Sequence, residues 1–127
     1  MFKEIVICVI IVVSIFSVDM YTQNYTTDTT NQITKIFSKL KEEIINEDKV
    51  KIKNIIKELD EIWNEKHHKL AYYIEHDELE KVDVSIINMK SFVETEDFAS
   101  AIAEVDEGKF ILEHIKDKYE FTLENVF

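Results

Sequence analysis

The sequence has little that bends or crosslinks a chain. It contains no proline, one glycine (Gly108) and one cysteine (Cys8). Because glycine and proline most often break helices and form sharp turns, their scarcity favours helices joined by short polar connections. A single cysteine also excludes an intramolecular disulfide. With 127 residues, the chain is expected to form one all-α domain at most.

Signatures of catalysis are missing as well. The sequence has no glycine-rich loop that could cradle a phosphate, and Cys8 lies inside an apolar run. Surface serines are then the only nucleophiles left to consider. The sequence therefore predicts a protein that is not an enzyme and that binds no cofactor.

Apolar residues recur at the helical spacing of three and four over most of the chain. The expected helices cover residues 33 to about 45, 49 to 75, 77 to 93, and about 97 onward. Asn46 or Asp48 is the expected cap of the second helix, and Asp77 that of the third. A tight turn is predicted between these two helices, with one bent helix as the alternative. Residues 46–50 and 94–98 echo each other, since each opens a helix after acidic residues. The pattern predicts an antiparallel bundle of about four helices.

Three positions in these helices carry specific expectations. Trp63, the only tryptophan, lies on the apolar stripe of its helix and is expected in the core. His67 lies on the same stripe and is expected to be a hydrogen-bonded core or interface histidine. Gly108 lies on the stripe of the last helix, where it would let another helix come close or would mark a bend. That stripe is wide, so the last helix is expected to pack between two others.

An apolar run covers residues 5–18 and is interrupted only by two serines. As a helix it would be roughly 21 Å long, short of the ~30 Å hydrocarbon core of a bilayer. Phe2, Met20 and Tyr21 can extend it. We therefore expect residues 1–21 to form an uncleaved membrane anchor. A cleaved signal peptide and a buried soluble helix are the alternatives.

Lysine placement gives the expected orientation of this anchor. No lysine lies between Lys3 and Lys35, so the amino terminus is expected to stay inside. The rest of the chain would then be extracytoplasmic, which describes a single-pass protein of the cell membrane. Residues 22–34 include six threonines and would form a solvated stalk or a continuing helix. The bundle is expected over residues 35–127.

The charge of the chain is one-sided, with a net charge of −11 at pH 7. Residues 35–74 hold nine lysines and eight acidic residues, whereas residues 75–107 hold two lysines and eleven acidic residues. An acidic surface repels nucleic acid, so no DNA or RNA partner is expected. The surface could dock a basic partner, hold divalent cations loosely, or simply keep the domain soluble.

The candidates for a protein contact are aromatic residues beside the apolar stripes and acidic residues around the start of the third helix. They are Tyr72, Phe92, Glu75, Asp77, Glu78, Glu80 and Asp83. Together with the anchor, they lead to the hypothesis of a membrane protein that acts by binding. Its partner would be another envelope protein or a second copy of the chain.

A metal site is the alternative hypothesis. Glu65 and His68 stand three residues apart, a spacing used by carboxylate-bridged metal bundles, and His76 and Asp77 lie near the junction of two helices. Such bundles need a second glutamate–histidine pair, which the sequence lacks. His68 and His76 would be roughly 12 Å apart along a continuous helix, so only a turn could bring them to one ion. The main expectation is therefore that no residue ligates a metal.

The layout as a whole resembles a known family. Trp63, residues 76–79, residues 112–115 and the ending 121–127 are similar to the pattern of the domain-of-unknown-function 4363 family. Its members are short bacterial proteins, found mostly in spore-forming Gram-positive bacteria. The resemblance covers nearly the whole chain and implies a membrane-anchored helical protein, without any catalytic residue.

Overall fold

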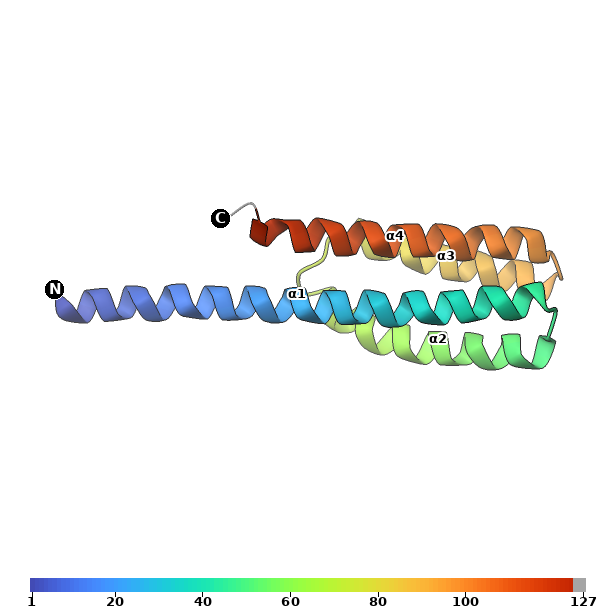
Figure 1. Cartoon of the computed structure of the whole chain (residues 1–127), viewed down its shortest axis with the longest axis horizontal. Helices are drawn as coiled ribbons and strands as arrows, with labels where there is room; N and C mark the ends of the chain where they lie inside the picture. The colour runs from blue at the N-terminus through green and yellow to red at the C-terminus, as the bar shows by residue number, and fades with distance from the viewer. Residues whose placement is uncertain (125–127) are drawn as a thin grey trace.

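The computed structural model describes the backbone of residues 1–124 and the side chains of residues 1–120. Over this part of the chain it has four helices: α1 (Phe2–Ile45), α2 (Lys49–Leu70), α3 (His76–Glu94) and α4 (Phe98–Glu124). The helices run antiparallel to their chain neighbours, and α1 extends far beyond the other three (Figure 1). The predicted all-α bundle is confirmed.

Helix α1 is continuous over 44 residues, or about 66 Å. The threonine-rich segment 22–34 lies inside it, so of the two predicted forms the structure has the helix. Thr26, Thr29 and Thr30 are buried, and packing therefore starts before residue 35. The Thr26 hydroxyl donates to the Thr22 carbonyl at 2.7 Å, and the Thr30 hydroxyl donates to the Thr26 carbonyl at 2.9 Å. These bonds satisfy the hydroxyls within the helix, which lets threonine face the core.

The two turns far from the amino terminus share one geometry. Glu47 and Glu96 adopt positive φ angles of 55° and 59°. The next amide, of Asp48 or Asp97, donates to a carbonyl five residues earlier, at 3.2 and 2.8 Å respectively. This arrangement is the Schellman motif, in which glycine is the usual residue at positive φ. The sequence echo between residues 46–50 and 94–98 is thus a repeated helix stop.

The Asp48 side chain then caps α2 by accepting a hydrogen bond from the Lys51 amide at 3.2 Å. This confirms one of the two predicted caps, while Asn46 ends α1 instead. Asp97 accepts from the Ser100 amide at the same distance. An acidic residue thus opens both helices that follow the distal turns.

The junction between α2 and α3 is a turn, as predicted, but it begins earlier. Helix α2 ends at Leu70 rather than Glu75, and α3 begins at His76. The prediction that Asp77 caps α3 is wrong, because Glu75 occupies the cap position without a side-chain hydrogen bond. Asp77 lies in the first turn, where its charge still suits the positive end of the helix dipole.

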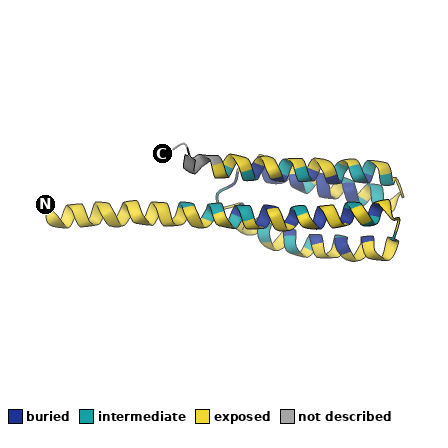
Figure 2. Cartoon of the chain, viewed as in Figure 1, coloured by how far each residue is buried: buried dark blue, intermediate teal, exposed yellow. Residues whose placement is uncertain are grey.

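The core runs along the bundle and receives side chains from every helix (Figure 2). Trp63 is buried, as predicted. Helix α4 packs against both α1 and α3, and α1 also packs against α2. At Gly108, an added Cβ would lie 3.0 Å from Ser85 Oγ and 3.1 Å from Phe37 Cζ. Gly108 therefore permits a close approach, and α4 packs between two helices as its wide stripe predicted.

Candidate interaction surfaces

Residues 2–18 of α1 extend beyond the bundle and are all exposed (Figure 2). Its apolar side chains are exposed on every side of the helix: Ile5, Val6, Ile7, Val9, Ile10, Ile11, Val12, Val13, Ile15, Phe16 and Val18. Within the described residues, α1 is the one helix long and apolar enough to cross a membrane. Residues 2–18 of a helix measure about 26 Å, which is close to the ~30 Å hydrocarbon core of a bilayer.

The two serines in this run do not leave their hydroxyl groups unpaired. Ser14 donates to the Ile10 carbonyl and Ser17 to the Val13 carbonyl, both at 2.8 Å. A hydroxyl bonded to its own helix needs no water, so both serines are compatible with a hydrocarbon environment. Cys8 is exposed on the same helix.

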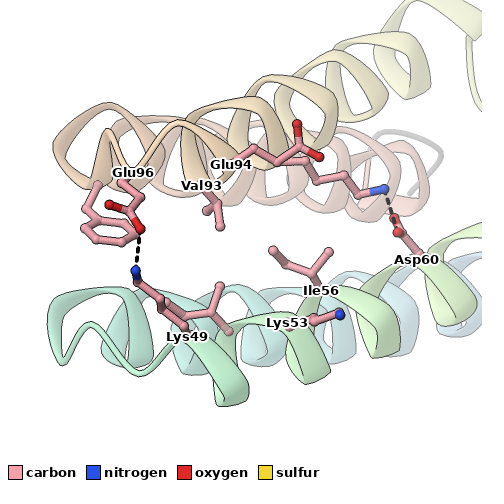
Figure 3. Close-up of a pocket in the computed structure, with 10 residues that line it drawn as sticks. Lys49, Lys53, Ile56, Asp60, Val93, Glu94 and Glu96 are labelled. Carbon is pink, nitrogen blue, oxygen red and sulfur yellow. Dashed lines mark hydrogen bonds and ion pairs between the residues drawn. The ribbon is translucent and has the colours of Figure 1, made fainter.

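A groove of about 520 Å³ lies between α2 and α3. Its apolar residues are Ile52, Ile56, Val93 and Phe98, as Figure 3 shows in part. Two ion pairs join its walls, Lys49 with Glu96 and Lys90 with Asp60. The hydrogen bond with Glu96 raises the pKa of Lys49. The charged residues of this groove thus largely neutralise one another.

Closer to the α2–α3 turn, Asp83 joins α2 to α3. Its Oδ1 atom accepts a hydrogen bond from Trp63 Nε1 at 2.6 Å, and its Oδ2 atom lies 3.2 Å from His67 Nε2. His67 is therefore an interface histidine, as its place on the stripe predicted. Asp83, a predicted contact residue, is partly exposed and also makes these two contacts within the molecule.

Glu78 must be removed from the predicted contact surface. It is 8% exposed, and its Oε1 atom lies 3.0 Å from Lys118 Nζ of α4. That hydrogen bond raises the pKa of Lys118. His114 Nε2 stands 4.0 Å from the same carboxylate. A charge buried at a helix interface in this way joins α3 to α4 and is not available to a partner.

A second groove, which we call the acidic groove, lies between α3 and α4 and measures about 660 Å³. Its charged residues are four acids and one lysine: Asp77, Glu80, Glu104, Glu107 and Lys81. Val84 and Phe110 also line it and are 47% and 71% exposed. An exposed phenylalanine among acidic side chains is the combination expected where a basic, partly apolar segment docks.

Glu104 is the most confined acid of this groove. Within the described residues, its Oε2 atom is buried and makes no hydrogen bond. Burial raises the pKa of Glu104, and the nearby charge of Glu107 raises it further. A cation brought into the groove would relieve both effects, because it would supply an opposite charge.

The sequence prediction found one wall of the acidic groove and missed the other. Asp77 and Glu80 were predicted contact residues and are exposed. Glu104 and Glu107 were counted in the predicted acidic surface but were not named as contact residues, and Phe110 was in neither set. Their signal is spacing, because residues three apart share one face of a helix.

The remaining predicted contacts divide between surface and core. Tyr72 is 89% exposed in the turn between α2 and α3, and Glu75 is exposed beside it. Phe92 is partly buried and packs against the core, so it contributes to stability rather than to a free surface.

The candidate metal ligands do not form a site. Glu65 and His68 are exposed on α2, whereas His76 and Asp77 are exposed at the start of α3. Within the described residues, no group of three or more histidine, cysteine, aspartate or glutamate side chains could hold an ion. The turn between the helices therefore does not unite the four residues.

The fold and surfaces describe a four-helix bundle continuous with a candidate membrane helix. Residues 20–126 match the family model described as "Domain of unknown function (DUF4363)", and the chain belongs to this family. The match confirms the resemblance noted from the sequence and begins where the apolar run ends. No curated protein and no solved structure matches the chain.

Proposed function

We propose that the protein is anchored in the cell membrane by α1 and acts by binding another protein of the cell envelope. The observation that supports the anchor is the exposed apolar part of α1, residues 2–18, about 26 Å long. Lys3 precedes it, and the next lysine is Lys35. This distribution favours an amino terminus inside and a bundle outside the cytoplasm.

The acidic groove is the surface we assign to the partner. It offers four acids, one lysine and the exposed ring of Phe110. A partner segment with lysine or arginine beside an apolar residue would match both its charge and its aromatic contact. The groove between α2 and α3 is less suited, because ion pairs already span it.

Self-association through the acidic groove is disfavoured. A two-fold dimer would place the same patch of each copy against the other. Asp77, Glu80, Glu104 and Glu107 would then face their own copies, and like charges brought together repel. The proposed partner is therefore a different, basic protein.

Site-directed photocrosslinking in native membranes tests this proposal. A benzophenone amino acid would replace Phe110 in the full chain, and the matched control would carry it at Val50. Both positions are 71% exposed, but Val50 lies on α2, away from the acidic groove. We expect a heterologous product from position 110 only, and less of it at 1 M salt, where charge attraction is screened within about 3 Å.

Three outcomes would count against the proposal. The same products from both positions would indicate random contact. A product containing only the chain itself would indicate self-association instead. No heterologous product at position 110, with the protein present in the membrane fraction, would leave the acidic groove without its partner.

A further inference from the structure

All five tyrosines of the chain lie at one end of the bundle. Tyr21 and Tyr25 follow the apolar run of α1, and their rings stack with centroids 6.3 Å apart. Tyr73 and Tyr119 come from the α2–α3 turn and from α4, and their rings meet edge to face at 6.2 Å. Tyr72 extends from the same turn. We call these five residues the tyrosine collar.

Hydrogen bonds fix the collar at the level where α1 leaves the bundle. The Tyr73 hydroxyl lies 2.6 Å from the Thr26 hydroxyl and donates to the Thr22 carbonyl at 3.2 Å. The Tyr119 hydroxyl accepts from the Glu75 amide at 3.1 Å. In Figure 1 the α2–α3 turn lies beside α1 at this level, and both distal turns lie at the opposite end.

Resting on the proposed anchor, we propose that the tyrosine collar is a lipid-contact surface that seats the bundle in the phospholipid headgroup layer. Asp19 is the first charged residue after the apolar run. Thr22 and Thr26 follow it by about 4.5 and 10.5 Å along the helix axis. The headgroup layer on each side of a bilayer is about 5 to 8 Å thick, so Thr22 would lie inside it and Thr26 just beyond it.

Tyrosine is the side chain expected at such a boundary, because its ring is apolar and its hydroxyl is polar. Tyr72 is 89% exposed although it is a large aromatic residue. Its place in the turn points to an environment that is neither bulk water nor the bundle core. Helix α1 is continuous, so the end of the bundle that carries the collar directly follows the proposed membrane helix.

Charges of both signs surround the collar and match a zwitterionic headgroup. A cleft of about 220 Å³ opens at this level and is lined by Asp19, Thr22, Gln23, Thr26, Tyr73 and Tyr119. Its one carboxylate and two tyrosine rings suit the ammonium group of such a headgroup. Lys66 and Lys69 lie over the ring of Tyr25, at 5.3 and 5.4 Å, and Lys118 lies 6.0 Å from the centre of the Tyr119 ring. These lysines suit the phosphate of the same headgroup.

Fluorescence quenching in phosphatidylcholine vesicles tests the position of the collar. The full chain would carry Cys8→Ser and a single labelled cysteine, either Ala71→Cys in the α2–α3 turn or Asn46→Cys in a distal turn. Both positions are exposed. Headgroup-attached nitroxide lipid should quench the label at 71 at least threefold more than the label at 46. Added anionic lipid should not increase that quenching.

Flotation of the vesicles separates this inference from the proposed anchor. If the full chain does not float, both are overturned. If it floats but the two labels are quenched equally, or if anionic lipid is needed for quenching at 71, this inference alone is overturned.

A tyrosine variant tests whether the side chains matter. Tyr72→Ser should reduce quenching at position 71 at least twofold. Val50→Ser is the matched control, since Val50 is also strongly exposed but lies outside both the collar and the acidic groove, and it should leave the quenching unchanged. Unchanged quenching in Tyr72→Ser would overturn the proposal, because the anchor alone would then set the position of the bundle.

Discussion

The two parts of α1 carry apolar residues in opposite ways. Residues 5–18 are apolar around the whole helix, and their large apolar side chains are all exposed. Residues 22–45 carry apolar and threonine side chains on one face, and that face is buried: Thr26, Thr29, Thr30, Ile33, Ile36, Phe37, Leu40 and Ile44. One continuous helix thus has two environments.

This difference shows what each pattern requires. A one-sided stripe can be covered by other helices of the same chain, as α2 and α4 cover it here. A helix that is apolar all round would need neighbours on every side, whereas none of the apolar window in this part of α1 is buried by the described residues. A bilayer would cover it without any specific contact, because lipid tails are apolar in every direction.

Removing residues 2–18 should have the largest effect. We expect the truncated protein to move from the membrane fraction to the soluble fraction. Its free energy of unfolding should change by less than about 0.5 kcal/mol, because these residues bury nothing in the bundle. Fractionation and thermal unfolding of the soluble bundle would check both. A bundle that fails to fold would show that the comparison is wrong.

Matched isoleucine substitutions would sharpen the comparison within one helix. Ile33→Ala should cost about 2 to 5 kcal/mol, because Ile33 is completely buried. Ile11→Ala, at a position that is 52% exposed, should cost less than about 0.5 kcal/mol. Unfolding in detergent, followed by circular dichroism, measures both. Equal costs would contradict the division of α1 into two environments.

Thr26 tests where the packed part begins. Thr26→Val should cost about 1 kcal/mol, because it removes the hydroxyl that pairs with Tyr73 at the edge of the bundle. Ser14→Ala is the control, since the Ser14 hydroxyl bonds only its own helix, and it should be nearly neutral. Denaturant unfolding would compare the two. If Thr26→Val leaves the free energy of unfolding unchanged, the packed part of α1 begins nearer to Ile33.

Glu47 tests where the packed part ends. Glu47→Gly should stabilise the protein by about 1 kcal/mol, because glycine adopts the positive φ of this helix stop without steric cost. Glu42→Gly, one turn earlier in α1, should instead destabilise by about 1 kcal/mol. Melting temperatures of the two variants should therefore shift in opposite directions.

Glu104 should give the smallest effect, and one that depends on pH. Its raised pKa means that ionised Glu104 lowers the stability of the fold at neutral pH. Glu104→Gln should therefore stabilise the protein at pH 7, by less than about 1 kcal/mol. The gain should shrink as pH falls through the raised folded pKa and vanish below the ordinary value of 4.5, where Glu104 is protonated in both states. Thermal unfolding from pH 7 to pH 4 would follow it.

Much of the fold could be predicted from local pattern. Helical spacing located four helices, Asp48 was one of two predicted caps, and Trp63 and Gly108 were placed on packed stripes. The end of α2 at Leu70 was missed, since Leu70, Tyr73 and Ile74 keep the helical spacing through the turn. Helical spacing shows only which residues are apolar. Apolar residues of a buried turn can continue that spacing beyond the end of a helix.

The candidate site was less predictable, because it depends on which helices meet. Glu78 and Asp83 look like solvated acids in the sequence, yet Lys118 and Trp63 bind them across helix interfaces. Phe110 looks like a flanking core residue, yet it lies exposed in the acidic groove. Distances between residues far apart in sequence decided these roles.

By itself, the sequence determined the helical class, the apolar run and the uneven charge, since these follow from composition and from spacing along one helix. Only the tertiary structure decided that the threonine-rich segment packs, which acids remain exposed, and that all five tyrosines gather where α1 leaves the bundle. The physical reason is that burial and charge pairing depend on neighbouring helices, and those neighbours are set by the packing of the whole bundle.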